Sequence, residues 1–133
     1  MINGKVVDTS VWIDYFNNVI NSHTNLAATF VDNDSLYMLP VILQEVLQGI
    51  RDEKNFLLIK KAFLQHPFLP YNEVEMAINA ASLYRFLISK GITIRKPNDC
   101  LIASLCIENN LPLLHKDRDF DNIAKHTSLK IYK

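Results

Sequence analysis

Short apolar runs alternate with longer amphipathic stretches along this chain. The runs at residues 6–7, 36–38, 113–114 and 129–131 predict β-strands. Apolar residues recur every three or four positions elsewhere, which predicts helices over residues 11–16, 40–50, 55–64, 73–90 and 97–109. Strands separated by helices need crossover connections, which favour parallel pairing and helices on both faces of the sheet. We therefore expect an α/β fold, a three-layer α/β/α domain with a short, mainly parallel sheet.

The helix predicted over residues 73–90 has the clearest pattern. One continuous apolar face is formed by Val74, Ala77, Ile78, Ala81, Tyr84 and Ile88. Asn72, followed three residues later by Glu75, resembles a capping box, and Gly91 suits the position just past the helix end.

Length and composition describe an ordinary globular protein. The 133 residues fit a single domain spanning residues 1–133. The formal net charge is zero, which argues against broad nonspecific attraction to nucleic acid or membrane. A local basic patch is still allowed, although solvated surface charge explains each member equally well: Arg51, Arg95, Lys96, Lys116 and Arg118. No apolar stretch long enough for a signal peptide or membrane span precedes Lys5 and Asp8, so we expect a cytoplasmic protein.

The two cysteines do not predict a disulfide. Cys100 and Cys106 lie on one predicted helix and are separated by about 9 Å along its axis, which is too far for a bond. Neither has a histidine at metal-ligand spacing, so both are expected to be small buried residues. Each of the four histidines is likewise expected to be a surface or core residue rather than a ligand.

Acidic residues carry the candidate chemistry. Asp8 and Asp117 each follow a predicted strand directly, so they should emerge at the same edge of a parallel sheet. Asp99 lies in the first turn of its helix, where a carboxylate is also favoured by the helix dipole. Glu45 lies beside the apolar face of its helix, and Gly49 either leaves room beside it or ends the helix.

Several carboxylates that converge in one cleft repel one another, and a divalent cation relieves that repulsion. Such a set suits Mg²⁺ or Mn²⁺ and the hydrolysis of phosphodiester bonds, with one or two ions. Asp119 is positioned to serve a second ion, whereas Asp121 reads as a helix cap or surface acid. Ser10 either orients water or a phosphate oxygen or caps the following helix. The three glycines are isolated, so no phosphate-binding loop is predicted.

About half of the residues are apolar, and a small domain has difficulty burying so many apolar side chains in its own core. We therefore expect a homodimer that uses helical surfaces. Candidate exposed aromatic residues are Trp12, Tyr15, Phe16, Phe56 and Phe63, although each is equally well explained as core.

Four segments together resemble the PIN-domain nucleases, and within them the VapC-type toxins of bacterial toxin–antitoxin modules. They are residues 7–14, 44–51, 97–103 and 115–120, in order and at family-like spacing. The resemblance implies a PIN fold and a Mg²⁺- or Mn²⁺-dependent endoribonuclease site. By motif position it implies a catalytic role for Asp8, Glu45, Asp99 and Asp117. Asp119 shares the variable fourth position, and Ser10 matches a small hydroxyl residue beside the first aspartate.

The resemblance further implies an RNA substrate, with structured RNAs such as tRNA among the family's targets. It also implies a homodimer and a cognate antitoxin. The antitoxin is expected to bring a basic residue to the acidic cleft. Residues 18–35 match no motif and are candidates for the partner groove or for substrate contacts.

Three alternatives remain at this point. A degenerate, non-catalytic module of the PIN family is disfavoured by the intact set of acids. A housekeeping RNA-processing nuclease of the same family would share the site but lack an antitoxin. A phosphoacceptor receiver domain has a similar length and also carries acids at strand ends. It would require an acidic pair after the first strand and an aspartate after a middle strand, and the chain shows neither.

Overall fold

The computed structural model describes residues 4–132, and that part of the chain contains seven helices and two short strands. In chain order the elements are β1 (Val6–Val7), α1 (Thr9–Phe16), α2 (Ser22–Asp32), α3 (Pro40–Gln48), α4 (Glu53–Phe63), α5 (Glu73–Ser89), α6 (Pro97–Glu108), β2 (Leu113–Leu114) and α7 (Arg118–His126). All five predicted helices are present, whereas α2 and α7 are additional. None of the helices in the described residues has the length and apolar content needed to cross a bilayer.

The sheet is short and parallel, as predicted. Val6 pairs with Leu113 and Val7 with Leu114. Isolated parallel bridges widen it, joining Lys5 to Leu36, Met38 to Phe68 and Leu113 to Ile131. The predicted strands at residues 36–38 and 129–131 therefore contribute single bridges rather than continuous strands.

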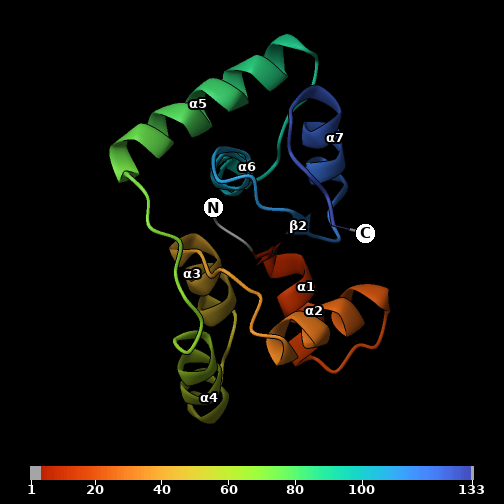
Figure 1. Cartoon of the computed structure of the whole chain (residues 1–133), viewed down its shortest axis with the longest axis vertical. Helices are drawn as coiled ribbons and strands as arrows, with labels where there is room; N and C mark the ends of the chain where they lie inside the picture. Colours follow the sequence, from red (N-terminus) through yellow and green to blue (C-terminus); the bar gives the residue numbers. More distant parts are fainter. Residues whose placement is uncertain (1–3, 133) are drawn as a thin grey trace.

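The helices form two groups around the strands (Figure 1). In the first group, α1 contacts α2 and α3, and α3 contacts α4. In the second group, α6 contacts both α5 and α7. The predicted arrangement of helices about a short parallel sheet is confirmed.

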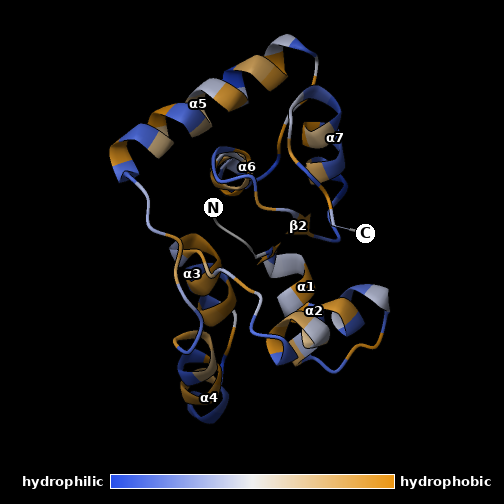
Figure 2. Ribbon diagram, in the orientation of Figure 1, coloured by the Kyte–Doolittle hydropathy of each residue, from blue (hydrophilic) through white to orange (hydrophobic). Residues whose placement is uncertain are grey.

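The core runs through the strands, α1 and α6. Figure 2 shows α6 as largely apolar, and nearly all its residues from Asp99 to Cys106 are buried. Trp12 and Phe63 are also buried, and their rings lie 5.0 Å apart, edge to face. These two aromatic residues are therefore core, not candidates for an exposed interface. Cys100 and Cys106 are buried free thiols, as expected.

The apolar face predicted for α5 is exposed instead of buried. Val74 is 72% exposed and Ile78 is 61% exposed, whereas Met76 and Leu87 lie in the core. The reason is that α5 carries two apolar faces, and α6 covers the one that contains Met76 and Leu87. Periodicity alone cannot tell which face another helix will cover. Asn72 is the N-cap of α5, as predicted, and accepts a hydrogen bond from the N–H of Glu75 at 2.9 Å, although the described residues do not show the return bond of a capping box. Gly91 has a φ of 79° and directly follows the C-cap Lys90, as predicted.

Candidate active site and metal centre

The carboxyl ends of β1 and β2 bring Asp8 beside the loop that precedes α7. The N–H of Asp8 donates to the carbonyl of Leu114 at 2.9 Å. The hydroxyl of Ser10 donates to Asp8 Oδ2 at 2.7 Å and accepts from the N–H of Lys116 at 3.1 Å. Asp8 is also the N-cap of α1, so the interpretation of Ser10 as the cap is wrong. Ser10 instead links the first acid to the opposite strand end.

Three carboxylates converge where α6 and α7 begin. Asp99, Asp117 and Asp119 each offer an oxygen, and these oxygens all lie within 4.8 Å of one another. Asp99 is 3% exposed, and its Oδ2 has no hydrogen-bond partner among the described residues. Asp117 caps α7 by accepting from the N–H of Asp119 at 3.0 Å. An all-oxygen set of this size suits a hard divalent cation.

The crowding of carboxylates changes the protonation of Asp99. Burial, followed by the negative charge of Asp8, raises the pKa of Asp99 to about 7. Lys96 opposes this rise, and Asp117 adds to it. Burial also raises the pKa of Asp8. In the absence of a cation, these carboxylates therefore hold protons more readily than exposed ones do.

Two basic side chains pair with the acids of this cluster. Arg95 Nη2 donates to Asp117 Oδ1 at 3.1 Å, and its Nε donates to Asp119 Oδ2 at 3.2 Å. Lys96 Nζ lies 3.7 Å from Asp117 Oδ2. These pairs raise the pKa of Arg95 further, with Asp119 as the main cause. Two members of the predicted basic patch thus lie at the acidic site itself.

Glu45 lies on α3 beside this cluster rather than within it. The hydroxyl of Thr9 donates to Glu45 Oε1 at 2.7 Å, which holds the half-buried carboxylate toward the start of α1. The negative charge of Glu45 contributes to the raised pKa values of both Asp8 and Asp99. Gly49 is the C-cap of α3, and a methyl group built on it would make only ordinary contacts. Of the two interpretations of Gly49, the structure supports the helix end.

His115 is a residue of the site that the sequence did not single out. It is 6% exposed, and its Nδ1 accepts from the N–H of Asp117 at 3.0 Å. Nδ1 is therefore unprotonated, and Nε2 donates to Asp121 Oδ1 at 3.1 Å. Asp121 is not the cap of α7 but an exposed surface acid, the other alternative, and its carboxylate fixes this imidazole. The available signal was a histidine two residues before an acid at a strand end.

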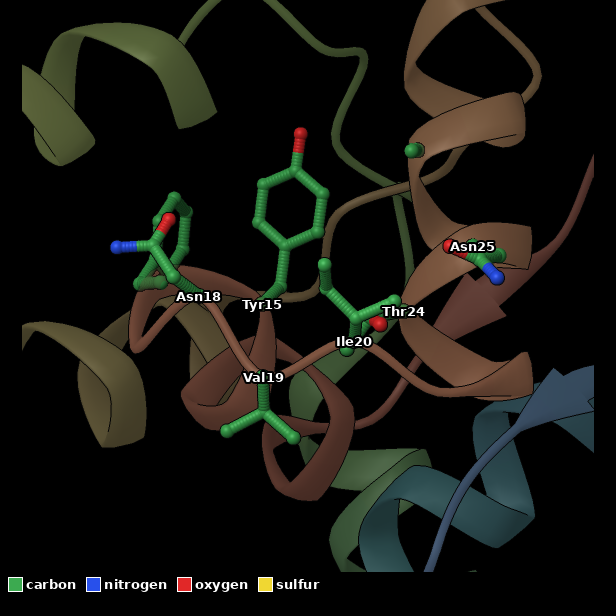
Figure 3. A pocket seen from close by; sticks show the side chains of 8 residues that line it. Tyr15, Asn18, Val19, Ile20, Thr24 and Asn25 are labelled. Atoms are coloured by element: carbon green, nitrogen blue, oxygen red, sulfur yellow. The ribbon is translucent and has the colours of Figure 1, made fainter.

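A groove of about 400 Å³ lies between α1 and α2 (Figure 3). It is lined by Tyr15, Phe16, Asn18, Val19, Ile20, Thr24, Asn25 and Ala28. The segment that matched no motif therefore forms one wall of a surface groove. A smaller cavity of about 160 Å³ lies beside Glu45 and the end of α3.

Comparison with known proteins agrees with this geometry. The family model of the PIN domain matches residues 5–126. Ribonuclease VapC11 from Mycobacterium tuberculosis is 31% identical over 131 residues, which cover 94% of this chain and 95% of that protein. The family match removes the receiver-domain alternative.

Solved structures show the same fold. The crystal structure of DNA-bound VapBC from Salmonella typhimurium has a TM-score of 0.75 at 21% identity, covering 98% of this chain and 97% of that chain. VapBC2 from Rickettsia felis, bound to a promoter DNA fragment, has a TM-score of 0.73 at 20% identity and covers 96% of both chains.

Proposed function

This chain belongs to the PIN-domain family, and from that membership we propose that it is a Mg²⁺- or Mn²⁺-dependent endoribonuclease, the toxin of a toxin–antitoxin pair. The observation that carries the proposal is the buried Oδ2 of Asp99, which has no hydrogen-bond partner among the described residues. A buried anionic oxygen without a donor is unfavourable unless a cation completes its surroundings. Asp117 and Asp119 supply the further oxygens within reach.

The residues present fit such a cation. All the donors are carboxylate oxygens, the type that Mg²⁺ and Mn²⁺ prefer. We assign Asp8, Asp99, Asp117 and Asp119 as the residues that would hold it. A divalent cation bound there would lower the pKa of water and would stabilise the charge that develops on a phosphodiester.

The chain's own hydrogen bonds support a division of labour within the site. The hydroxyl of Ser10 binds Oδ2 of Asp8 and fixes the orientation of this carboxylate, so that Oδ1 is the oxygen not bound by the hydroxyl. Thr9 occupies Oε1 of Glu45, which leaves Oε2 to orient the attacking water and accept its proton. Ser10 is also close enough to the first acid to help position water or substrate.

The antitoxin is proposed from the kinship with VapC11 and from the VapBC structures of the same fold. The groove between α1 and α2 suits an amphipathic segment, because Val19 and Ile20 on its rim are 43% and 86% exposed. A basic residue beyond that segment would pair with the carboxylates and compete with the cation. The chain would act in the cytoplasm, which contains its RNA substrate. Structured RNAs such as tRNA are the candidate substrates.

The homodimer is proposed from the exposed face of α5. Val74, Ile78, Phe86 and Ile88 are each more than 40% exposed on one helix. A second copy that covers this face would remove an apolar patch from water. The proposed dimer would therefore use α5 rather than the aromatic residues of α1, which are Trp12, Tyr15 and Phe16.

The direct test is cleavage of a fluorescent RNA by the purified chain. We expect products with Mg²⁺ or Mn²⁺, none in excess chelator, and none from Asp8→Asn. Cleavage that continues in chelator would refute the cation mechanism, and an active Asp8→Asn would refute the site.

Expression in a bacterial host separates the toxin from a housekeeping nuclease. The wild-type chain should arrest growth, and Asp8→Asn should be harmless at the same level of soluble protein. Normal growth with abundant soluble wild-type protein would favour the housekeeping nuclease.

A further inference from the structure

The guanidinium of Arg95 pairs with carboxylates that a cation would use. It binds two of the three clustered carboxylates at once, with Nη2 on Asp117 Oδ1 and Nε on Asp119 Oδ2. The backbone N–H of Arg95 also approaches Asp119 Oδ2 at 3.4 Å. The side chains of Asp117 and Asp119 are only 10% and 8% exposed, so few other donors can reach them.

The acids of the site differ in how far the protein neutralises them. Asp117 and Asp119 have Arg95 and Lys96 as partners, whereas Asp99 has no basic group in hydrogen-bonding contact within the described residues. A cation bound by all three would lie close to the guanidinium, and the repulsion between the two positive charges opposes the simultaneous binding of both. Cation binding and the Arg95 pairs therefore oppose each other.

Arg95 is free to leave. Its side chain is 63% exposed, in contrast to the acids that it bridges. Once released, it would stand at the mouth of the site with five N–H donors in a planar fork. That fork matches phosphate oxygens as well as carboxylates.

We propose that Arg95 competes with the divalent cation for Asp117 and Asp119, and that cation binding releases its guanidinium to bind a phosphate of the RNA backbone. The second half rests on the proposed nuclease function, whereas the first half does not. The consequence is an order of binding. The divalent cation binds first, and its binding frees the guanidinium of Arg95 to contact the RNA.

Mn²⁺ binding without RNA tests the competition. Arg95→Gln removes the charge while keeping a polar side chain, so Mn²⁺ should bind about tenfold more tightly by titration calorimetry. Arg95→Lys keeps the charge but loses the two-pronged geometry and should fall between the two. Lys60→Gln, on the exposed surface of α4, removes one positive charge away from the acids and serves as the control.

An increase in Mn²⁺ affinity of at least threefold for Arg95→Gln, with Lys60→Gln within twofold of wild type, supports the competition. A smaller increase, or the same increase in both variants, overturns it. Thermal unfolding in chelator verifies that each variant is folded before titration.

A 2′-O-methylated RNA oligonucleotide, which resists cleavage, tests the release. At saturating Mn²⁺, Arg95→Gln should bind it three- to tenfold more weakly than wild type, and Lys60→Gln should bind it normally. Equal binding by Arg95→Gln and wild type overturns the phosphate contact. If no variant binds the oligonucleotide while the Mn²⁺ result holds, the proposed ribonuclease function fails and the competition stands.

Discussion

Asp99→Asn should stabilise the cation-free protein at neutral pH while removing its function. The folded chain raises the pKa of Asp99 from 3.8 to about 7, mainly by burial and by the charge of Asp8. A raised pKa in the folded state means that folding favours the protonated acid. The stabilisation that the protonated Asp99 gives the folded state is therefore complete below about pH 4. It is lost as the pH rises from there through about 7. Asparagine has no proton to lose, so the variant escapes this loss.

The magnitude follows from the shift. At about 1.4 kcal/mol per pKa unit, the rise from 3.8 to about 7 corresponds to about 4 kcal/mol at full ionisation. Relaxation and the buried amide of the variant reduce this, so we expect a gain of about 2 to 4 kcal/mol above pH 7. Such a gain would be a large part of the stability of a domain of this size.

Urea unfolding in excess chelator between pH 4 and pH 8 measures the effect. The free energy of unfolding of Asp99→Asn minus that of wild type should be close to zero at pH 4 and should rise to a plateau above pH 7. Asp32→Asn, at the exposed end of α2, removes a carboxylate outside the cluster and is the matched control. A pH-independent difference for Asp99→Asn, or a variant less stable than wild type at pH 8, would refute the reasoning. Saturating Mg²⁺ should then stabilise wild type much more than the variant, because only wild type keeps the complete ligand set.

Three further changes test other parts of the structure. Phe63→Ala should lower the free energy of unfolding by about 3 to 5 kcal/mol in urea titrations, because this ring is buried against Trp12. Ile78→Glu should halve the mass measured by light scattering without lowering the unfolding temperature, because the residue is exposed within one copy; an unchanged mass would refute the α5 interface. His115→Asn keeps an acceptor near Nδ1 and should bind Mn²⁺ more tightly than His115→Leu does, whereas equal affinities would show that the bond to Asp117 is unimportant.

Periodicity predicted the main elements but not the two helices with the least apolar character. α2 begins Ser22-His23-Thr24-Asn25, residues that favour caps and turns over helix interiors. It is stabilised by a reciprocal capping box between Asn21 and Thr24 and by burial of Ala27 and Phe30, and the burial is a tertiary effect. α7 is mostly polar and depends on two buried apolar residues, Phe120 and Ile123.

The sequence predicted those parts of the site whose position follows from the order of strands and helices. Asp8 and the residues around Asp117 meet because both follow strands of one parallel pair, which the order of elements implies. The pairing of Arg95 with Asp117 and Asp119 could not be predicted in the same way, because it depends on where the turn before α6 directs one long side chain. His115 was missed for a similar reason, since a buried histidine at a strand end is usually a packing residue.

The buried acids of the site are unfavourably placed when no positive group is near them, and this links the separate observations. Burial and mutual repulsion raise the pKa of Asp99, so a positive group that enters the cluster gains the energy of relieving them. Arg95 provides part of that relief from within the chain. A divalent cation would provide it with the geometry for hydrolysis, and a basic residue of an antitoxin would provide it without that geometry. If all three compete for the carboxylates of Asp117 and Asp119, activity would depend on which positive group holds them. An inhibitor that works this way does not have to block the entry of RNA; it has only to remain paired with these carboxylates more firmly than the divalent cation does.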